Sequence, residues 1–203
     1  MAAFLLLSMP TTAQEVTVLA LGDSLTQGYG LPEAQGFVPQ LRAWLAAQGQ
    51  DVAVINGGVS GDTTAGGAAR ADWSLTPEVD AMILTLGGND LLRGIAPEVA
   101  RANLAKILDV AQAREVEVLL VGLQAPANYG PEYKQAFDRI YPALAEQYGT
   151  LHFESFFNGL GVIDPGQARP FFQPDGIHPN AEGVVRIVEG IGPAVIDLIE
   201  AAK

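Results

Sequence analysis

The chain has 203 residues, of which 23 are acidic and 11 are basic, so its formal net charge at pH 7 is -12. The length suits one domain with a sizeable core, and a hydrophobic content of 49% is ordinary for a globular protein. The acidic balance argues against nucleic acid as a partner, the absence of cysteine excludes disulfides and thiolate nucleophiles, and the presence of only two histidines disfavours a multi-histidine metal site.

Residues 1–13 have the pattern of an export signal. An apolar run at residues 4–7 is followed by small and turn-forming residues up to Ala13, after which we expect cleavage. The run is too short to span a bilayer, so we predict a periplasmic or secreted protein without stable membrane insertion. The usual positively charged start is missing, which we interpret as a truncated start. Residues 14–203 are then predicted to form a single domain.

The rest of the chain alternates between predicted strands and helices. Strands are expected at residues 16–22, 52–55, 81–86, 116–121 and 151–153, and helices at residues 37–48, 63–73, 97–111 and 137–144. Pro142 is expected to kink the last of these helices. The chain ends in a further helical pattern, with a predicted break at residues 190–193. This alternation predicts an α/β fold with a mainly parallel sheet covered on both faces.

Three of the strands end in glycine-containing polar turns, at residues 22–24, 60–62 and 88–90. In a parallel sheet these turns meet along one edge, where open α/β folds bind their ligands. Ser24 is the candidate nucleophile there, and a serine needs a general base to become reactive. The competing interpretation is that each stretch is an ordinary turn.

The two histidines are the candidates for that base. His152 lies in an apolar strand, and we interpret it as a structural residue. His178 follows Asp175 by three residues, and Gly176 permits a tight turn between them. The carboxylate can therefore hold the imidazole tautomer whose other nitrogen faces Ser24. Alternatively, Asp175 and His178 belong to a helix cap or turn without a catalytic role.

Acyl transfer also needs hydrogen-bond donors for the oxyanion that forms during the reaction. Gly61 and Ser24 can each offer a backbone N–H, and Asn89 can offer its side-chain amide. The alternatives are that Gly61 is a turn glycine and that Asn89 caps a local turn.

Taken together and in order, these segments resemble the four sequence blocks of the SGNH (GDSL) hydrolase family. The blocks are Gly-Asp-Ser-Leu at residues 22–25, Ser-Gly-Asp at 60–62, Gly-Gly-Asn-Asp at 87–90 and Asp-Gly-Ile-His-Pro at 175–179. The resemblance covers residues 16–179. Within the family, residues 56–63, 86–94 and 126–130 are most similar to the exported bacterial branch of arylesterases, thioesterases and lysophospholipases.

The resemblance implies a three-layer α/β/α sandwich with a flavodoxin-like sheet of five parallel strands. It also implies that Ser24 is the nucleophile, His178 the base and Asp175 the residue that orients the histidine, with Ser24, Gly61 and Asn89 as oxyanion donors. No metal or cofactor is expected. The Gly-x-Ser-x-Gly elbow of α/β-hydrolases is absent, because Thr26 stands at its last position.

The predicted substrate is a small-molecule acyl ester or thioester. Leu91, Leu92 and Pro126 follow the third and fourth strands, and we expect them to bind a short-to-medium acyl chain by apolar contact. Arg93 is a candidate for contact with an anionic leaving group, the alternative being a solvated surface arginine.

Two other classes of function remain as alternatives. One is a non-catalytic domain that binds acyl lipids or acetylated sugars on the same fold. The other is a flavin- or phosphate-binding module in which residues 24–26 hold a phosphate at a helix N-terminus.

Overall fold

The computed structural model describes residues 16–161 and 165–203, so the predicted signal at residues 1–13 lies outside the described part. In that part, five parallel strands form one sheet in the order β2-β1-β3-β4-β5. The strands are β1 (Val16–Gly22), β2 (Val52–Gly58), β3 (Ala81–Thr85), β4 (Glu117–Val121) and β5 (Leu151–Phe153). The predicted α/β class with a five-stranded parallel sheet is confirmed.

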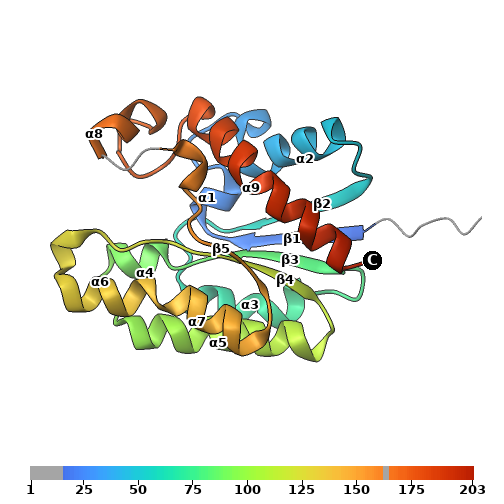
Figure 1. Ribbon diagram of the computed structural model, residues 1–203, viewed down its shortest axis with the longest axis horizontal. Helices are drawn as coiled ribbons and strands as arrows, with labels where there is room; N and C mark the ends of the chain where they lie inside the picture. The colour runs from blue at the N-terminus through green and yellow to red at the C-terminus, as the bar shows by residue number, and fades with distance from the viewer. Residues whose placement is uncertain (1–15, 162–164) are drawn as a thin grey trace, which may run out of the picture.

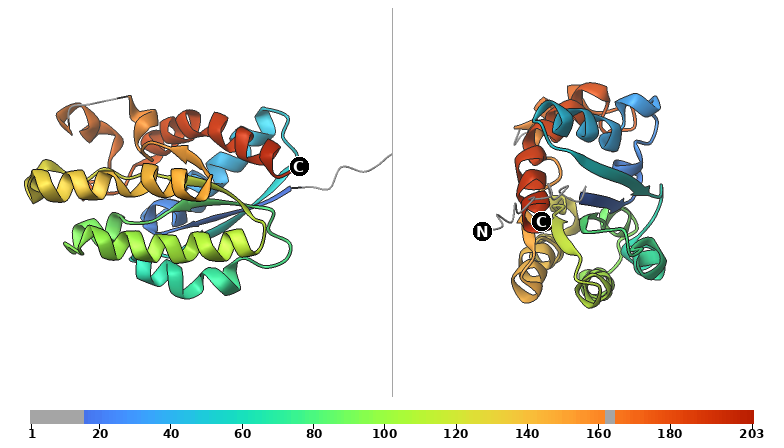
Figure 2. Two further views of the ribbon diagram at one scale, coloured as in Figure 1. Left: turned by 60° about the horizontal axis from the view of Figure 1, so that its bottom comes forward. Right: turned by 90° about the vertical axis from the view of Figure 1, so that its right-hand side faces the viewer.

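Helices cover both faces of this sheet, as Figures 1 and 2 show from different sides. One face carries α2 (Phe37–Ala47) and α9 (Ala181–Ala201), and the other carries α3 (Thr64–Ser74), α5 (Pro97–Ala113), α6 (Pro131–Asp138) and α7 (Ile140–Tyr148). The shorter elements are α1 (Ser24–Gln27), α4 (Gly88–Leu92), α8 (Pro165–Ala168), η1 (Glu33–Gln35), η2 (Ala127–Tyr129), η3 (Asn158–Leu160) and η4 (Arg169–Phe171). Of these, α1, α4 and α8 lie toward the end of the molecule where the strands finish (Figure 1).

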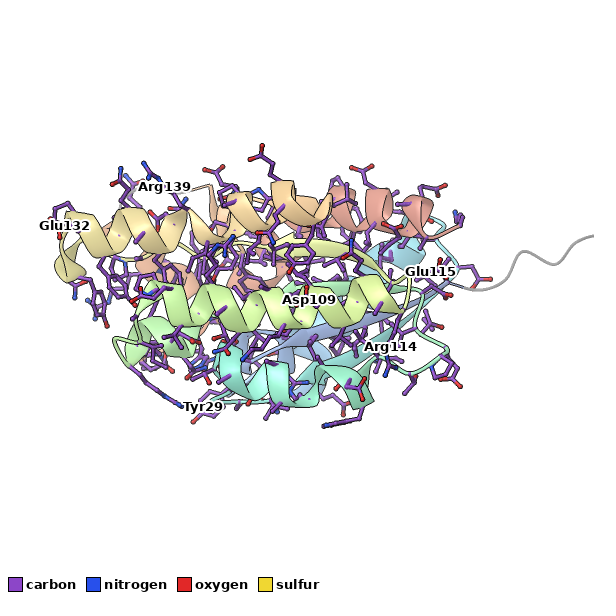
Figure 3. All side chains as sticks on the ribbon, turned by 90° about the horizontal axis from the view of Figure 1, so that it is seen from below. Tyr29, Asp109, Arg114, Glu115, Glu132 and Arg139 are labelled. Carbon is purple, nitrogen blue, oxygen red and sulfur yellow. The ribbon has the colours of Figure 1, made fainter. Side chains whose placement is uncertain are left out.

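The core lies on both sides of the three central strands. Leu21, Leu84 and Leu120 are completely buried, because the helices on both faces of the parallel sheet shield its central strands from solvent. The outward sides of the helices carry charged residues such as Asp109 and Arg139, which Figure 3 labels.

The predicted break at residues 190–193 is wrong, since α9 runs unbroken from Ala181 to Ala201 with Pro193 inside it. The two glycines serve close packing instead. A Cβ at Gly190 would lie 2.5 Å from the Cα of Gly159, and one at Gly192 would lie 2.5 Å from the ring of Trp44. The buried face of the helix outweighs the hydrogen bond that proline cannot make.

Two other local expectations have different outcomes. The helical pattern around Pro142 is interrupted at Arg139, between α6 and α7, which agrees with the expected kink. His152, however, is exposed on β5, which forms one edge of the sheet. The interpretation of His152 as a packed structural residue is wrong, because the apolar pattern of its strand does not reveal that the strand is an edge.

Candidate active site

Ser24 is separated from the end of β1 only by Asp23 and is the first residue of α1, where we had expected a turn. The side chain of Asp23 caps this helix by accepting a hydrogen bond from the N–H of Leu25 at 3.0 Å. Only glycine fits at position 22, directly before Asp23, because a Cβ there would lie 2.0 Å from the Oγ1 of Thr26. The turn therefore places the Ser24 hydroxyl at the carboxyl edge of the sheet, on a short helix with a fixed start.

Ser24, His178 and Asp175 form a continuous chain of hydrogen bonds. The Nε2 of His178 is 2.9 Å from the Oγ of Ser24, and its Nδ1 is 2.7 Å from the Oδ2 of Asp175. The Oδ1 of Asp175 accepts from the backbone N–H groups of Ile177 and His178, at 2.9 and 3.0 Å. The bond to the His178 side chain, followed by the one to the Ile177 N–H, lowers the pKa of Asp175 to about 2. Asp175 is thus ionised at neutral pH and faces the imidazole nitrogen that must carry a proton.

The predicted oxyanion donors lie on neighbouring turns. Asn89 is in the first turn of α4, and its Nδ2 is 3.4 Å from the Oδ2 of Asp23. Gly61 lies between β2 and α3 with a φ of +84°, a conformation that favours glycine. Among the hydrogen bonds between described residues, none uses the backbone N–H of Ser24 or Gly61. Both groups are therefore available to a ligand oxygen.

A partly buried network of hydrogen bonds, which the sequence did not predict, holds the Gly61 turn in place. The Nε of Arg70 is 2.7 Å from the Oδ2 of Asp62, and its Nη2 donates to the carbonyl of Gly22 at 2.8 Å. Arg93 donates from Nη2 to the carbonyl of Gly61 at 2.8 Å, so the residue expected near a leaving group is bonded to this turn. The turns before Ser24 and around Gly61 are thus tied to one another.

Asp23 is a second residue whose importance was missed. Its side chain is 1% exposed, and burial raises its pKa to about 6, against the opposing effect of the bonds from Leu25 and Asn89. A buried carboxylate is costly, and it persists here because it accepts hydrogen bonds from both the Leu25 N–H and the Asn89 amide. An acidic residue directly after a buried strand was the available signal.

A cavity of about 350 Å³ opens beside Ser24. All three predicted substrate-binding residues line it: Leu91 is buried in its wall, Leu92 is 58% exposed, and Pro126 belongs to the segment after β4. Its other apolar lining residues are Leu25, Leu123, Tyr129, Phe157, Phe172 and Ile177. The wall is therefore mostly hydrocarbon, with the Ser24 hydroxyl and the Asn89 amide among its few polar groups.

In residues 16–161 and 165–203, no three histidine or acidic side chains are grouped closely enough to hold a metal ion. In the same part of the chain, no helix is both long and apolar enough to cross a membrane.

Residues 20–185 match the model of the GDSL-like lipase/acylhydrolase family. The chain belongs to this family. It is 41% identical to the esterase TesA of Pseudomonas aeruginosa, over 97% of this chain and 95% of that protein. It is 36% identical to an arylesterase of Vibrio mimicus, over 95% and 94% of the two chains.

Two further comparisons agree with this membership. The chain is 36% identical to thioesterase 1/protease 1/lysophospholipase L1 of Escherichia coli K12, over 88% of this chain and 83% of that one. A crystal structure of TesA superposes with a TM-score of 0.81 at 41% identity, covering 90% of this chain and 99% of that chain. This SGNH (GDSL) family member is a carboxylic ester hydrolase of the esterase, arylesterase and thioesterase type.

Proposed function

We propose that this family member hydrolyses carboxylic esters by way of an acyl-enzyme on Ser24. Aryl esters are the first substrate class, and thioesters and lysophospholipids are further ones. The observation that carries the proposal is the chain of hydrogen bonds from Ser24 Oγ to His178 Nε2 at 2.9 Å and from His178 Nδ1 to Asp175 Oδ2 at 2.7 Å. These are the distances over which a base and its orienting carboxylate act.

The reaction takes two steps. In the first, Nε2 of His178 removes the proton from Ser24 while Oγ attacks the ester carbonyl, and the imidazolium then protonates the departing alcohol or thiol. In the second, the same nitrogen removes a proton from water as the water attacks the acyl-enzyme. The imidazolium then returns this proton to Ser24 Oγ as the bond to the acyl group breaks and the acid is released. The ionised Asp175 stabilises the imidazolium that forms in both steps.

The negative charge that develops on the carbonyl oxygen is stabilised by three donors. We assign these to the backbone N–H groups of Ser24 and Gly61 and to the side-chain amide of Asn89. Donors held in place before the reaction are worth more than flexible ones, because they need no reorganisation when the charge appears. The hydrogen bonds from Arg70 to the Gly22 carbonyl and from Arg93 to the Gly61 carbonyl support this assignment, because they hold the two turns that carry the backbone donors.

The experiment that tests the enzyme against the non-catalytic alternative is labelling with a serine-directed fluorophosphonate. We expect one covalent adduct on Ser24, no adduct in Ser24→Ala, and much slower labelling in His178→Ala. Ser24→Ala should lose on the order of 10⁵–10⁶ in kcat. Retention of more than a few per cent of activity in purified Ser24→Ala would overturn the proposed nucleophile, and binding of acyl lipid without labelling would favour the non-catalytic domain.

The cavity beside Ser24 supports a short-to-medium acyl chain as the bound group. Each methylene buried against its wall contributes about 0.8 kcal/mol, so kcat/KM should rise with chain length until the wall ends. The measurement is kcat/KM for aryl esters from acetate to palmitate, in the wild type and in the Leu91→Ser/Leu92→Ser double variant. A profile that is flat, or that the double variant leaves unchanged, would show that the chain lies elsewhere.

We also propose that the protein is exported to the periplasm or medium, on the basis of the pattern in residues 1–13. Cell fractionation and N-terminal sequencing of the mature protein test this. We expect a new N-terminus at Gln14. A full-length chain confined to the cytoplasm of its native host would contradict export.

A further inference from the structure

The Gln173 side chain joins two loops that the proposed mechanism leaves unconnected. Its Nε2 donates to the carbonyl oxygen of Tyr29 at 2.8 Å and to that of Pro179 at 3.0 Å. One amide thus uses both of its N–H groups to link the segment at Tyr29, 144 residues before Gln173, to the segment at Pro179. The first segment follows α1, and the second immediately follows His178.

The backbone of Gln173 also closes the loop that carries Asp175 and His178. Its N–H donates to the carbonyl of His178 at 2.8 Å, and its own carbonyl accepts from the N–H of Gly176 at 2.9 Å. The four residues between Gln173 and His178 are exposed. Few packing contacts are therefore available to hold this loop, and its hydrogen bonds at Gln173 matter correspondingly more.

The other linked segment presents an aromatic ring to the histidine. The ring centroids of Tyr29 and His178 are 4.7 Å apart, with an angle of 40° between the planes. Tyr29 (labelled in Figure 3) is 50% exposed, so its own packing does little to fix it. Gly30, with a φ of +74°, leaves room for the amide, because a Cβ there would lie 2.3 Å from the Oε1 of Gln173.

We propose that Gln173 is a positioning residue for the triad: its amide fastens the Tyr29 segment to the histidine loop and thereby holds His178 at bonding distance from Ser24. The Tyr29 segment, to which the amide bonds, is connected to α1, the helix that begins at Ser24, since the N–H of Tyr29 donates to the carbonyl of Ser24 at 3.1 Å. The two hydrogen bonds of the Gln173 amide therefore set the distance between Ser24 and His178, and the Tyr29 ring limits the rotation of the imidazole. This inference rests on the proposed function.

The primary test is Gln173→Met, which keeps the length of the side chain and removes both hydrogen bonds. We expect kcat to fall on the order of tenfold to a hundredfold, the scale of a small misplacement of reacting groups. KM should stay nearly unchanged, because neither Gln173 nor Tyr29 lines the cavity beside Ser24. The matched control is Gln40→Met. Gln40 lies on α2, and its Nε2 likewise donates to a backbone carbonyl, that of Ala34 at 2.7 Å. This control variant should leave kcat unchanged.

A spectroscopic measurement separates positioning from loss of stability. The Nδ1 proton of His178, shared with Asp175, gives a downfield proton resonance that reports the geometry of the pair. We expect this resonance to shift and broaden in Gln173→Met at a temperature where the variant is fully folded. It should be unaltered in Gln40→Met.

Two further variants keep the inference testable if Gln173→Met folds poorly. Tyr29→Leu retains the carbonyl that Gln173 binds and removes only the ring, while Gly30→Ala introduces a methyl group against the amide. Each should lower kcat without raising KM. Because the Gln173 amide and the Tyr29 ring both act through the position of His178, their effects are coupled, and the Tyr29→Leu/Gln173→Met double variant should lose less than the product of the single losses.

The inference is overturned if Gln173→Met retains wild-type kcat and an unchanged His178 resonance, or if the two single losses multiply in the double variant. It is also overturned if the main effect is a rise in KM, which would make Gln173 a substrate-binding residue. Failure of this inference can be distinguished from failure of the proposed function: activity in Ser24→Ala defeats the triad itself, whereas inactive Ser24→Ala with fully active Gln173→Met defeats only the positioning role.

Discussion

Replacing Asp23 by asparagine should remove a loss of stability that the wild type suffers as the pH rises, and should at the same time make the enzyme less active. The wild-type carboxyl is 1% exposed, and burial raises its pKa from an ordinary 3.8 to about 6. The folded state therefore holds the proton more tightly than the unfolded state does. The stability linked to Asp23 is fully present below about pH 4 and is lost as the pH rises through about 6.

The size of this effect follows from the two pKa values. The difference between 3.8 and about 6 corresponds to about 3 kcal/mol, at roughly 1.4 kcal/mol for each tenfold change in proton affinity. Wild type should thus lose up to about 3 kcal/mol relative to Asp23→Asn between pH 4 and 7. In Asp23→Asn, the loss of the hydrogen bond from Asn89 lowers the free energy of unfolding by an amount that is the same at every pH. Asp175 affects the pH dependence of stability only at more acidic pH, below about 4, because its pKa is lowered to about 2.

The assay is the free energy of unfolding by urea from pH 4 to pH 8 for wild type, Asp23→Asn and the control Asp51→Asn, at an exposed aspartate. We expect the wild-type and Asp51→Asn curves to run parallel, and Asp23→Asn to diverge upward above about pH 5. Parallel curves for wild type and Asp23→Asn across this range would refute the reasoning.

The activity of Asp23→Asn should fall for a separate reason. The new amide offers one oxygen to the N–H of Leu25, and its NH₂ group then faces the NH₂ group of Asn89. Two donors cannot satisfy one another, so Asn89 turns away from the oxyanion position. We expect a drop in kcat smaller than that of Asn89→Ala, with KM nearly unchanged; an Asp23→Asn enzyme with full kcat would contradict this.

Three further predictions concern single positions. Asn89→Ala should lower kcat by about 10²–10³ with little change in KM in steady-state assays, and a large rise in KM with intact kcat would make it a binding residue instead. Asp175→Asn should lower kcat by about 10⁴ near neutral pH, and a loss below tenfold would show that the carboxylate does not orient His178. Gly58→Ala should displace α1 from β2, because its Cβ would lie 2.3 Å from the backbone nitrogen of Gln27, so both melting temperature and kcat should fall; unchanged values would show that the contact relaxes at no cost.

The sequence by itself determined the class of the fold and the chemical groups of the site. Strand patterns that stop at glycine turns are local, and they placed Ser24, Gly61 and Asn89 at the ends of β1, β2 and β3. The Asp175–His178 pair is also local, because the two residues whose side chains bond to each other are only three positions apart in the sequence. Assigning these residues to one family was possible because their order along the chain was visible.

Tertiary structure decided the features that depend on which segments become neighbours. A helix of four residues has no stability alone, so α1 exists only because Asp23 caps it and β2 packs against it. Likewise, the unbroken course of α9 through Pro193 depends on burial of its face, and the exposure of His152 depends on β5 being an edge.

The same holds for the groups that support the site. The partners of Arg70 and of Gln173 lie up to 48 and 144 residues away in the sequence. Sequence periodicity records which side of an element is apolar and where the element ends. It carries no record of which distant carbonyl an amide or guanidinium will meet, because that contact forms only when the fold brings the two segments together.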